Sequence, residues 1–388
     1  MLQPAVSLPD VYRGREQTFI KHLILRRYLE RVARNVLWKQ PDFVFVDGFS
    51  GPWAAKTEGY DDTSFGIAMT LLRQVRADLK QTHGLERRVR CVFVEKGKSA
   101  FERLSAAVKA VPDIEAVPLH GRFEDRVQEV QRLVGNAFAL VSIDPKGWSF
   151  DLQRLAPLLR RRPGEVIVNF MYEHVNRFLD DSRPEIRNSY VLPFGDPEWR
   201  TRFEKLTAKG MGREEAVVEL FRSQLKRVGD FDHVLSARIQ RATADRSHFY
   251  LFYGTRHEKG LIEFRKVERE AMEAEEVSRI EAKHDRRAAR TGQDLLFGAT
   301  ELSAPRSIEE LRRPEIARAT VWLSAQLARA RSAPYEKVMP ATLERFAMTE
   351  PEFKDVLIAL QQAGSIMLTG MGAKQRKPDR GVTICWAT

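Results

Sequence analysis

The sequence has little cysteine and no long apolar run. Only Cys91 and Cys385 occur in its 388 residues, far apart and without the His/Cys spacing of a zinc site. We therefore expect neither a disulfide framework nor a structural metal. No apolar run approaches the roughly 20 residues that cross a bilayer, and residues 1–10 lack the basic start and apolar core of a signal peptide. These absences predict a cytoplasmic protein without a membrane segment.

Positive charge is what the sequence has in excess. It contains 64 Lys and Arg against 53 Asp and Glu, a formal net charge of +11. Such a chain gains affinity for phosphate polymers by releasing counterions, although many basic proteins bind no nucleic acid. Residues 13–39 hold eight basic and two acidic side chains. A second cluster lies near the C-terminus, and we predict that it contacts nucleic acid: Lys374, Arg376, Lys377 and Arg380.

Short apolar segments alternate with amphipathic ones over the first two thirds of the chain. The apolar runs predict strands at 43–46, 89–94, 137–143, 165–170 and 249–254. Helical periodicity between them predicts helices at 16–38, 63–79, 98–110, 123–134 and 152–160. This alternation is typical of an α/β fold with a parallel sheet. We expect 234–240 to pair with the last strand as an antiparallel edge.

We predict three parts in the chain. Residues 1–265 form a Rossmann-like domain with helices on both faces of its sheet and a helical insertion at 171–230. Dense mixed charge predicts a solvated helical linker at 266–300. Residues 301–388 have the layout of a winged-helix domain, with helices at 307–330, 341–348 and 350–362 and strands at 365–369 and 381–386. Thr349 and Glu352 predict a capping box for the third of these helices.

The first candidate site follows the strand at 43–46. Asp47-Gly48-Phe49-Ser50-Gly51 places an acid and two glycines in the turn before the next helix. Glycine lets the backbone approach a ligand that is held at a helix N-terminus. In methyltransferases such a turn wraps the methionine part of S-adenosylmethionine, and its acid holds the ammonium group. The same residues also suit an ordinary turn at a strand end, because Asp and Gly tolerate its backbone angles.

Acids at the ends of the next two strands are candidates for the rest of the cofactor. Glu95, followed by Lys96, ends the strand at 89–94, and a carboxylate there can accept hydrogen bonds from both ribose hydroxyls. Glu124 lies shortly after His120, where a further strand would end beside the adenine. Each acid has a plainer explanation: Glu95 as a surface residue, and Glu124 as a helix N-terminal residue favoured by the dipole.

The candidate catalytic segment is Asp144-Pro145-Lys146-Gly147-Trp148, which follows the strand at 137–143. It resembles the Asp-Pro-Pro-aromatic motif of amino-methyltransferases, with the aromatic residue displaced by one position. In that motif the acid and the proline carbonyl accept hydrogen bonds from an exocyclic amine, and the aromatic ring stacks on the base. Alternatively, the segment is a strand-to-helix turn with Trp148 packed in the core.

These features together resemble the three-Cys-motif partner family. The resemblance rests on Phe45-Val46-Asp47-Gly48-Phe49-Ser50-Gly51-Pro52-Trp53, Glu95-Lys96, Ile143-Asp144-Pro145-Lys146-Gly147, Val168-Asn169-Phe170, and Tyr250-Leu251-Phe252-Tyr253-Gly254-Thr255-Arg256-His257 with Gly260-Leu261. With the winged helix it covers most of the chain. It implies a Rossmann-type methyltransferase, S-adenosylmethionine as cofactor, and a partner protein encoded nearby that carries the three-Cys motif. The sequence departs from the family pattern at Trp53, where a second glycine is usual and a bulky side chain could crowd the cofactor.

Two functions follow from the sequence. The first is methyl transfer to a nucleic-acid base amine, with Asp144, Pro145 and Trp148 at the amine and the turn at Asp47 on the cofactor. The second is a non-catalytic, nucleic-acid-binding or defence-associated adaptor that retains a methyltransferase fold. The winged helix could also dock a protein, because its net charge outside the basic turn is near zero.

Overall fold

The computed structural model describes residues 7–51, 55–148, 150–291 and 305–387. Trp53, the predicted obstacle in the cofactor turn, lies outside these residues. The chain divides into two compact units, Leu8–Arg256 and His257–Thr388, and each is described by itself. The division falls before residue 265, where we had placed the end of the first domain, because one helix runs without a break from Glu258 to Thr291.

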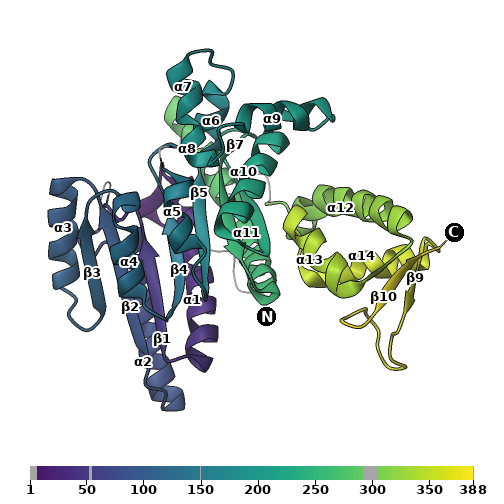
Figure 1. Cartoon of the computed structure of the whole chain (residues 1–388), viewed down its shortest axis with the longest axis horizontal. Helices are drawn as coiled ribbons and strands as arrows, with labels where there is room; N and C mark the ends of the chain where they lie inside the picture. The colour runs from purple at the N-terminus through teal and green to yellow at the C-terminus, as the bar shows by residue number, and fades with distance from the viewer. Residues whose placement is uncertain (1–6, 52–54, 149, 292–304, 388) are drawn as a thin grey trace. The chain divides into compact units, whose positions relative to one another are not determined.

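The first unit contains a seven-stranded sheet (Figure 1). Its strands are β1 (Asp42–Asp47), β2 (Arg88–Glu95), β3 (Glu115–His120), β4 (Phe138–Ile143), β5 (Gly164–Phe170), β6 (His233–Gln240) and β7 (Ser247–Thr255). They lie in the order β3-β2-β1-β4-β5-β7-β6. The first five are parallel, and β7 runs antiparallel to both β5 and β6. The predicted Rossmann-like sheet and its antiparallel edge are confirmed.

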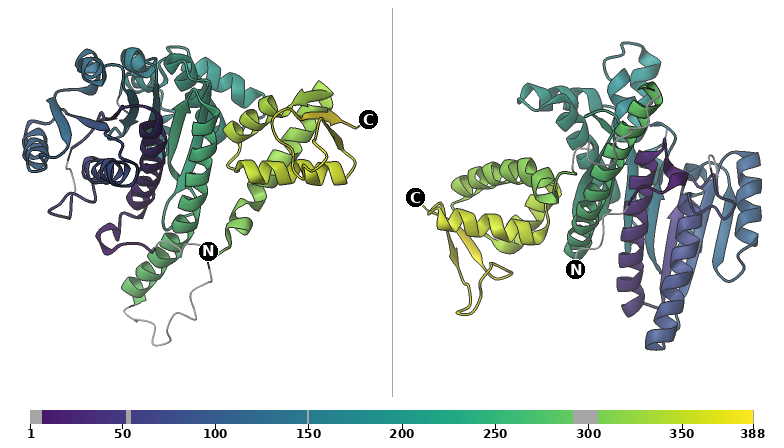
Figure 2. Two further views of the ribbon diagram at one scale, coloured as in Figure 1. Left: turned by 90° about the horizontal axis from the view of Figure 1, so that it is seen from below. Right: turned by 180° about the vertical axis from the view of Figure 1, so that it is seen from behind.

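Helices cover both faces of this sheet (Figure 2). They are α1 (Glu16–Lys39), α2 (Ser64–His83), α3 (Lys98–Lys109), α4 (Val127–Val134), α5 (Leu152–Leu159) and, between β5 and β6, α6 (Tyr172–Phe178), α7 (Pro184–Ser189), α8 (Val191–Phe194), α9 (Trp199–Ala208) and α10 (Arg213–Gly229). Two single turns, η1 (Asp10–Tyr12) and η2 (Phe123–Asp125), complete the unit. The predicted helix at 123–134 is thus divided into η2 and α4.

The strand alternation decides which side chains meet which helices. Val44 and Val46 join the core cluster that α4, α5 and α10 cover. Phe45 and Asp47 point to the other face, as successive strand residues must. By the same alternation, polar side chains at the ends of β1, β4 and β5 point toward α1 and the start of α2.

The helical segment at 171–230 belongs partly to the core. We predicted it as an insertion at the mouth of the sheet, and α6 to α9 fit that description. Its last helix, α10, instead packs on α5 and β6, and Phe221 and Leu225 on it are fully buried. α10 is therefore one of the layers of the fold, and its apolar stripe contributes to the main core.

In the second unit, the described residues form four helices and a small sheet. They are α11 (Glu258–Thr291), α12 (Ile308–Ala330), β8 (Ser332–Pro334), α13 (Tyr335–Arg345), α14 (Glu350–Gln362), β9 (Ile366–Thr369) and β10 (Thr383–Trp386). The sheet is antiparallel, in the order β8-β10-β9. The predicted capping box of Thr349 and Glu352 is confirmed. The helix predicted at 341–348 begins six residues earlier, and Pro340 lies inside it. Among the described residues, no helix combines the length and hydropathy needed to cross a bilayer.

The segment predicted as a solvated helical linker is helical where the structure describes it, but several of its charges, Glu268, Glu276 and Arg279, are buried. Arg265 is 1% exposed, bonds the carboxylate of Glu268 at 2.5 Å and donates to the backbone oxygen of Leu343 at 2.7 Å. Further along, Arg306 donates to Glu276 at 2.8 Å. Buried charges persist when they are paired and hydrogen-bonded. Part of the dense charge of this segment thus forms ion pairs inside the unit rather than a solvated surface.

Gly48 is predicted to be required for packing. A Cβ at this position would overlap the ring of Phe123, with Cε1 only 2.6 Å away, and overpacking of this kind costs about 1–3 kcal/mol. We expect Gly48→Ala to lower the free energy of unfolding by that amount in urea titrations. The control is Gly59→Ala, whose new methyl group would meet the flexible carboxylate of Asp61 at 3.1 Å. Equal stability of the two variants would contradict this role of Gly48.

Candidate functional site

A cleft of about 780 Å³ opens at the carboxyl edge of the parallel strands. The turn after β1 contributes Phe49 and Gly51, and the start of α2 contributes Thr63 and Ser64. The remaining walls come from α1, the segment after β4, the end of β5 and the start of β7; they include Lys21, Asp144–Trp148, Asn169, Met171, His248 and Phe249. Ligands of doubly wound sheets bind at this edge.

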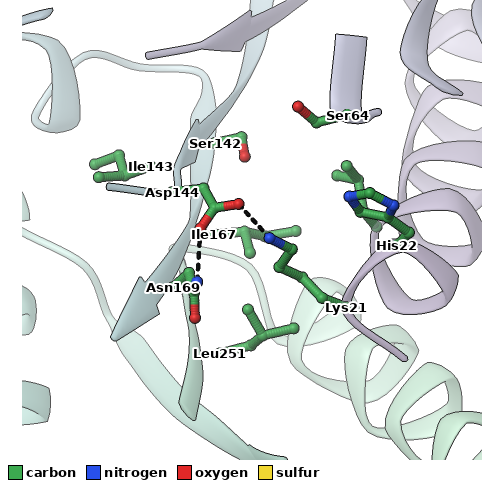
Figure 3. Close-up of a pocket in the computed structure, with 10 residues that line it drawn as sticks. Lys21, His22, Ser64, Ser142, Ile143, Asp144, Ile167, Asn169 and Leu251 are labelled. Carbon is green, nitrogen blue, oxygen red and sulfur yellow. Dashed lines mark hydrogen bonds and ion pairs between the residues drawn. The ribbon is translucent and has the colours of Figure 1, made fainter. Parts of the chain in front are cut away.

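The floor of the cleft is a polar cluster of three side chains (Figure 3). The ammonium of Lys21 lies 2.5 Å from Oδ2 of Asp144, and the amide of Asn169 donates to Oδ1 at 2.6 Å. The carbonyl oxygen of Asn169 is buried and has no hydrogen-bond partner among the described residues. A small cavity of about 20 Å³ beside the cluster is large enough for about one water molecule.

Asp144 is held as a carboxylate. Burial alone would raise its pKa, but the adjacent ammonium of Lys21 and the hydrogen bonds from Lys21 and Asn169 outweigh burial and lower the pKa below its usual value. His22, next to Lys21 on α1, is 7% exposed. Burial and the Lys21 charge lower its pKa to about 3, so the imidazole is neutral. Its Nδ1 shares a hydrogen bond of 2.9 Å with the hydroxyl of Tyr12.

Asp47 lies beneath the cleft rather than in its wall. It has no exposed surface, and its carboxylate accepts a hydrogen bond of 2.5 Å from the Ser64 hydroxyl and one of 3.0 Å from the amide of Phe49. Burial raises its pKa to about 6, although these two bonds oppose the shift. Asp47 therefore ties the β1 turn to the start of α2. Gly48 packs against Phe123, as described above, so the parts of this turn that line the cleft are Phe49 and Gly51.

The acids predicted to bind the ribose and the adenine, Glu95 and Glu124, also accept hydrogen bonds from backbone amides of the protein. Glu95 is 2% exposed, its Oε1 accepts from the amide of Gly97 at 2.5 Å, and burial raises its pKa. Glu124 is 6% exposed and accepts from the amide of Asp151 at 3.1 Å. Neither acid, nor the exposed Lys96, belongs to the wall of the cleft. Their roles in cofactor binding stay predictions.

Pro145 and Trp148 do lie in the wall of the cleft, beside Asp144. The indole of Trp148 stacks on Tyr190 with ring centroids 5.4 Å apart, and its Nε1 donates to the hydroxyl of Ser189 at 3.1 Å. One face of this ring is therefore used within the protein. Trp148 is half-buried, so it both packs on its neighbours and lines the cleft. Its predicted role in stacking on a substrate base stays a prediction.

In the C-terminal unit, the four predicted nucleic-acid contacts are exposed on the segment between β9 and β10. Two of them are paired with acids. Lys377 contacts the carboxylate of Asp355, and Arg380 contacts that of Glu258. Lys374 and Arg376 are the exposed cations of this segment with no partner among the described residues. The basic turn therefore offers less unpaired positive charge than its sequence suggests.

Three residues of the cleft, Lys21, Asn169 and His248, and the carboxylate partner of His248, Glu173, were not predicted as functional. Lys21 was counted as one basic residue of the N-terminal cluster, and Asn169 as part of the family resemblance. Neither sequence separation nor periodicity joins Lys21 to Asp144, 123 residues away. The other two, Glu173 and His248, form a pair across 75 residues. The signal that was available for Asn169 and His248 was their position at the end or start of a predicted strand, whereas Lys21 lies in the middle of a helix and had no such signal.

Comparisons with known proteins give weak similarities. No protein-family model and no curated protein sequence matches the chain. Among solved structures, it is similar to the O-methyltransferase TomG from Streptomyces achromogenes, involved in tomaymycin synthesis, in complex with S-adenosylmethionine (TM-score 0.31, 16% identity, 60% of this chain and 79% of that chain). It is also similar to an O-methyltransferase from Bacillus cereus in complex with S-adenosylhomocysteine (TM-score 0.30, 10% identity, 59% and 80%). A third similarity is to loganic acid methyltransferase with S-adenosylhomocysteine (TM-score 0.29, 10% identity, 72% and 92%).

The class of the fold therefore rests on topology rather than on these scores. The Rossmann order 3-2-1-4-5 continues here with β7 inserted antiparallel between β5 and β6. This is the sheet of the Rossmann-like methyltransferases that use S-adenosylmethionine. The unit Leu8–Arg256 has that fold.

The buried carboxyl of Asp47 predicts a pH dependence of stability. The pKa of Asp47 in the folded protein, about 6, lies above its unfolded value. The stability that the protonated carboxyl contributes is therefore fully present below pH ~4 and is lost as the pH rises through about 6. Asp47→Asn cannot ionise at this position. We therefore expect its free energy of unfolding, relative to that of the wild type, to rise by about 3 kcal/mol between pH 4 and pH 7.5. Urea unfolding of both proteins across this range measures the difference. Parallel stability curves would contradict the raised pKa.

Proposed function

We propose that the chain is an S-adenosylmethionine-dependent methyltransferase whose active site is the cleft at the carboxyl edge of its sheet. The observation that carries the proposal is that this cleft joins the turn after β1, the start of α2 and the acid after β4. In a doubly wound sheet these three positions lie around the topological switch point, where a nucleotide-like ligand binds.

The charges in the cleft fit the two ends of a methionine group. The cation Lys21 and the N-terminus of α2, a helix of 20 residues, provide positive potential for the carboxylate. The unpartnered carbonyl oxygen of Asn169 and the ionised Asp144 provide acceptors for the ammonium. An orphaned buried acceptor is costly unless a ligand or water satisfies it. Phe49 and Gly51 supply the turn along which the cofactor would lie.

When bound, S-adenosylmethionine supplies an electrophilic methyl group. The protein's residues have to orient the acceptor, exclude water and receive a proton. The sequence prediction of a base amine depends on free acceptors at Asp144 and Pro145. Each oxygen of Asp144 already accepts one hydrogen bond, from Lys21 or from Asn169, and the acceptor capacity that the carboxylate retains is assigned above to the ammonium of the cofactor. We therefore state the proposed function at the level of methyl transfer.

Nucleic acid remains a proposed partner through the C-terminal unit. The element order α12-β8-α13-α14-β9-β10 supports a winged helix, and Lys374 and Arg376 are the side chains that would contact phosphates. The three-Cys-motif partner family, with a partner protein encoded nearby, is likewise a proposal that rests on the sequence motifs alone.

Calorimetric titration tests the proposal. We expect the wild type to bind S-adenosylmethionine and also 5′-methylthioadenosine, which lacks the amino-acid end. Lys21→Gln should weaken S-adenosylmethionine by about tenfold or more, since a lost charged contact is worth about 1.5–3 kcal/mol. It should leave the affinity for methylthioadenosine unchanged, because Lys21 is assigned to the carboxylate.

The matched control is Lys39→Gln, which removes an exposed cation from the far end of the same helix. This variant should bind both ligands as the wild type does. Absence of heat with S-adenosylmethionine at high protein concentration would contradict the proposed function. Equal losses for the two ligands in Lys21→Gln would contradict the role given to Lys21.

A further inference from the structure

The start of β7 carries a bulge that turns an unusual residue toward the cleft. Gln240 on β6 pairs with Ser247, but the preceding residue, Ile239, pairs with Phe249. His248 is therefore the extra residue of the bulge. Consecutive strand residues normally point to opposite faces, whereas both His248 and Phe249 line the cleft. Bulges re-aim side chains in this way and are frequent beside active sites.

The direction of β7 brings His248 to the correct edge of the sheet. Because β7 runs antiparallel to β5, its first residues lie beside the last residues of β5, and Tyr250 pairs with Phe170. His248 thus stands at the carboxyl edge of the parallel strands and lines the same cleft as the turn after β1. The lining of the cleft also includes three apolar side chains, Trp148, Met171 and Phe249.

A carboxylate holds the imidazole in one orientation. Nδ1 of His248 lies 2.8 Å from Oε2 of Glu173, the second residue of α6. Burial would raise the pKa of Glu173, but its bonds to Arg241 and His248 outweigh burial and lower it. Arg241 donates to Oε2 at 2.5 Å, and Arg246 lies 3.3 Å from Oε1. The anion therefore accepts from Nδ1–H, and the lone pair of the neutral ring belongs to Nε2.

This second nitrogen is available to a ligand. Nε2 of His248 has no hydrogen-bond partner within the part of the chain that the structure describes, and the side chain is 24% exposed. A ring nitrogen fixed by a carboxylate through its other nitrogen is the arrangement of a general base. The two arginines beside Glu173 keep that carboxylate ionised and fixed, so it can orient the ring without taking the proton.

We propose that His248 is the general base of the methyl transfer and that the acceptor is a phenolic hydroxyl; this rests on the proposed function. The hydroxyl proton passes to Nε2 of His248 as the oxygen's electron pair forms the bond to the methyl carbon. The sulfur–methyl bond breaks, its electron pair stays on sulfur, and neutral S-adenosylhomocysteine leaves. The imidazolium then releases its proton to solvent. Glu173 is a positioning residue.

The chemistry of the site favours a phenol over an exocyclic amine. An amine attacks with its lone pair and needs hydrogen-bond acceptors for its protons, whereas the oxygens of Asp144 already accept from Lys21 and Asn169 and are assigned above to the ammonium of the methyl donor. A hydroxyl is a poor nucleophile until its proton is removed, and a phenol near pKa 10 is within reach of a histidine base. The apolar side chains of Trp148, Met171 and Phe249 in the lining also suit a planar aromatic ring.

The protonation of His248 can be read without turnover. We expect nitrogen NMR of protein labelled at its histidines to show His248 protonated at Nδ1 and bare at Nε2, with His248→Gln assigning the signal. In Glu173→Ala the preference for Nδ1–H should be lost, because the acceptor is gone. A wild-type His248 protonated at Nε2 would overturn the proposal.

The catalytic role is tested by measuring the formation of S-adenosylhomocysteine with a broad panel of catechols and other phenols. A single-stranded oligonucleotide that contains adenine and cytosine is tested in parallel as the amine substrate. We expect phenols to be methylated and His248→Gln to slow the reaction by about 100-fold or more, with unchanged affinity for S-adenosylmethionine. His83→Gln, at the exposed C-terminal end of α2 against Trp38, should keep the wild-type rate.

The outcomes separate this inference from the proposed function. If the wild type binds S-adenosylmethionine but methylates only the oligonucleotide, or no phenol at all, the acceptor class is overturned and the function stands. If His248→Gln keeps the wild-type rate on phenols, the base is overturned. If the wild type does not bind S-adenosylmethionine, the proposed function itself fails.

Discussion

The ion pair between Lys21 and Asp144 organises the site. It joins α1 to the end of β4, and Asn169 extends the contact to β5. An unpaired charge in this half-buried position would be costly, whereas the pair with its hydrogen bonds satisfies both groups. The pair also sets the chemistry of the cleft. Asp144 is an ionised carboxylate whose pKa is lowered, which makes it a weak base, so we assign proton removal to another side chain.

The neighbouring carboxyls show how burial and partners divide these roles. Asp47 and Asp144 follow adjacent strands, yet the pKa of Asp47 is raised to about 6 and that of Asp144 is lowered. The difference has a simple cause: Asp47 has neutral partners in Ser64 and a backbone amide, whereas Asp144 has a cation. Asp47 is therefore suited to holding the turn, and Asp144 to meeting a charged ligand. Titratable groups whose environments separate their pKa values commonly mark functional sites.

The sequence predicted the parallel core of the sheet well because each central strand is a continuous apolar run. It indicated that a further strand ends near His120 but gave β3 no bounds, since Glu115–His120 is less apolar and contains Pro118, which is tolerated on an edge strand. It also predicted the position of Asp144 at a strand end. It could not predict the pairing with Lys21, which depends on how α1 packs on the sheet. Nor could it predict His248, because a bulge leaves no periodic signal. Nor could it show that charges of the predicted linker are buried, because mixed charge looks the same in a sequence whether it is solvated or paired, as Glu268 is with Arg265.

The central claim is that one cleft, at the carboxyl ends of β1, β4 and β5, holds the methyl donor. A crystal structure with S-adenosylhomocysteine tests it most directly. We expect the ligand in the cleft, with its amino-acid end between Lys21, Asn169 and the start of α2, and its sulfur facing the side of the cleft that carries His248. A saturated crystal with an empty cleft, or with the ligand bound elsewhere on the chain, would contradict the claim.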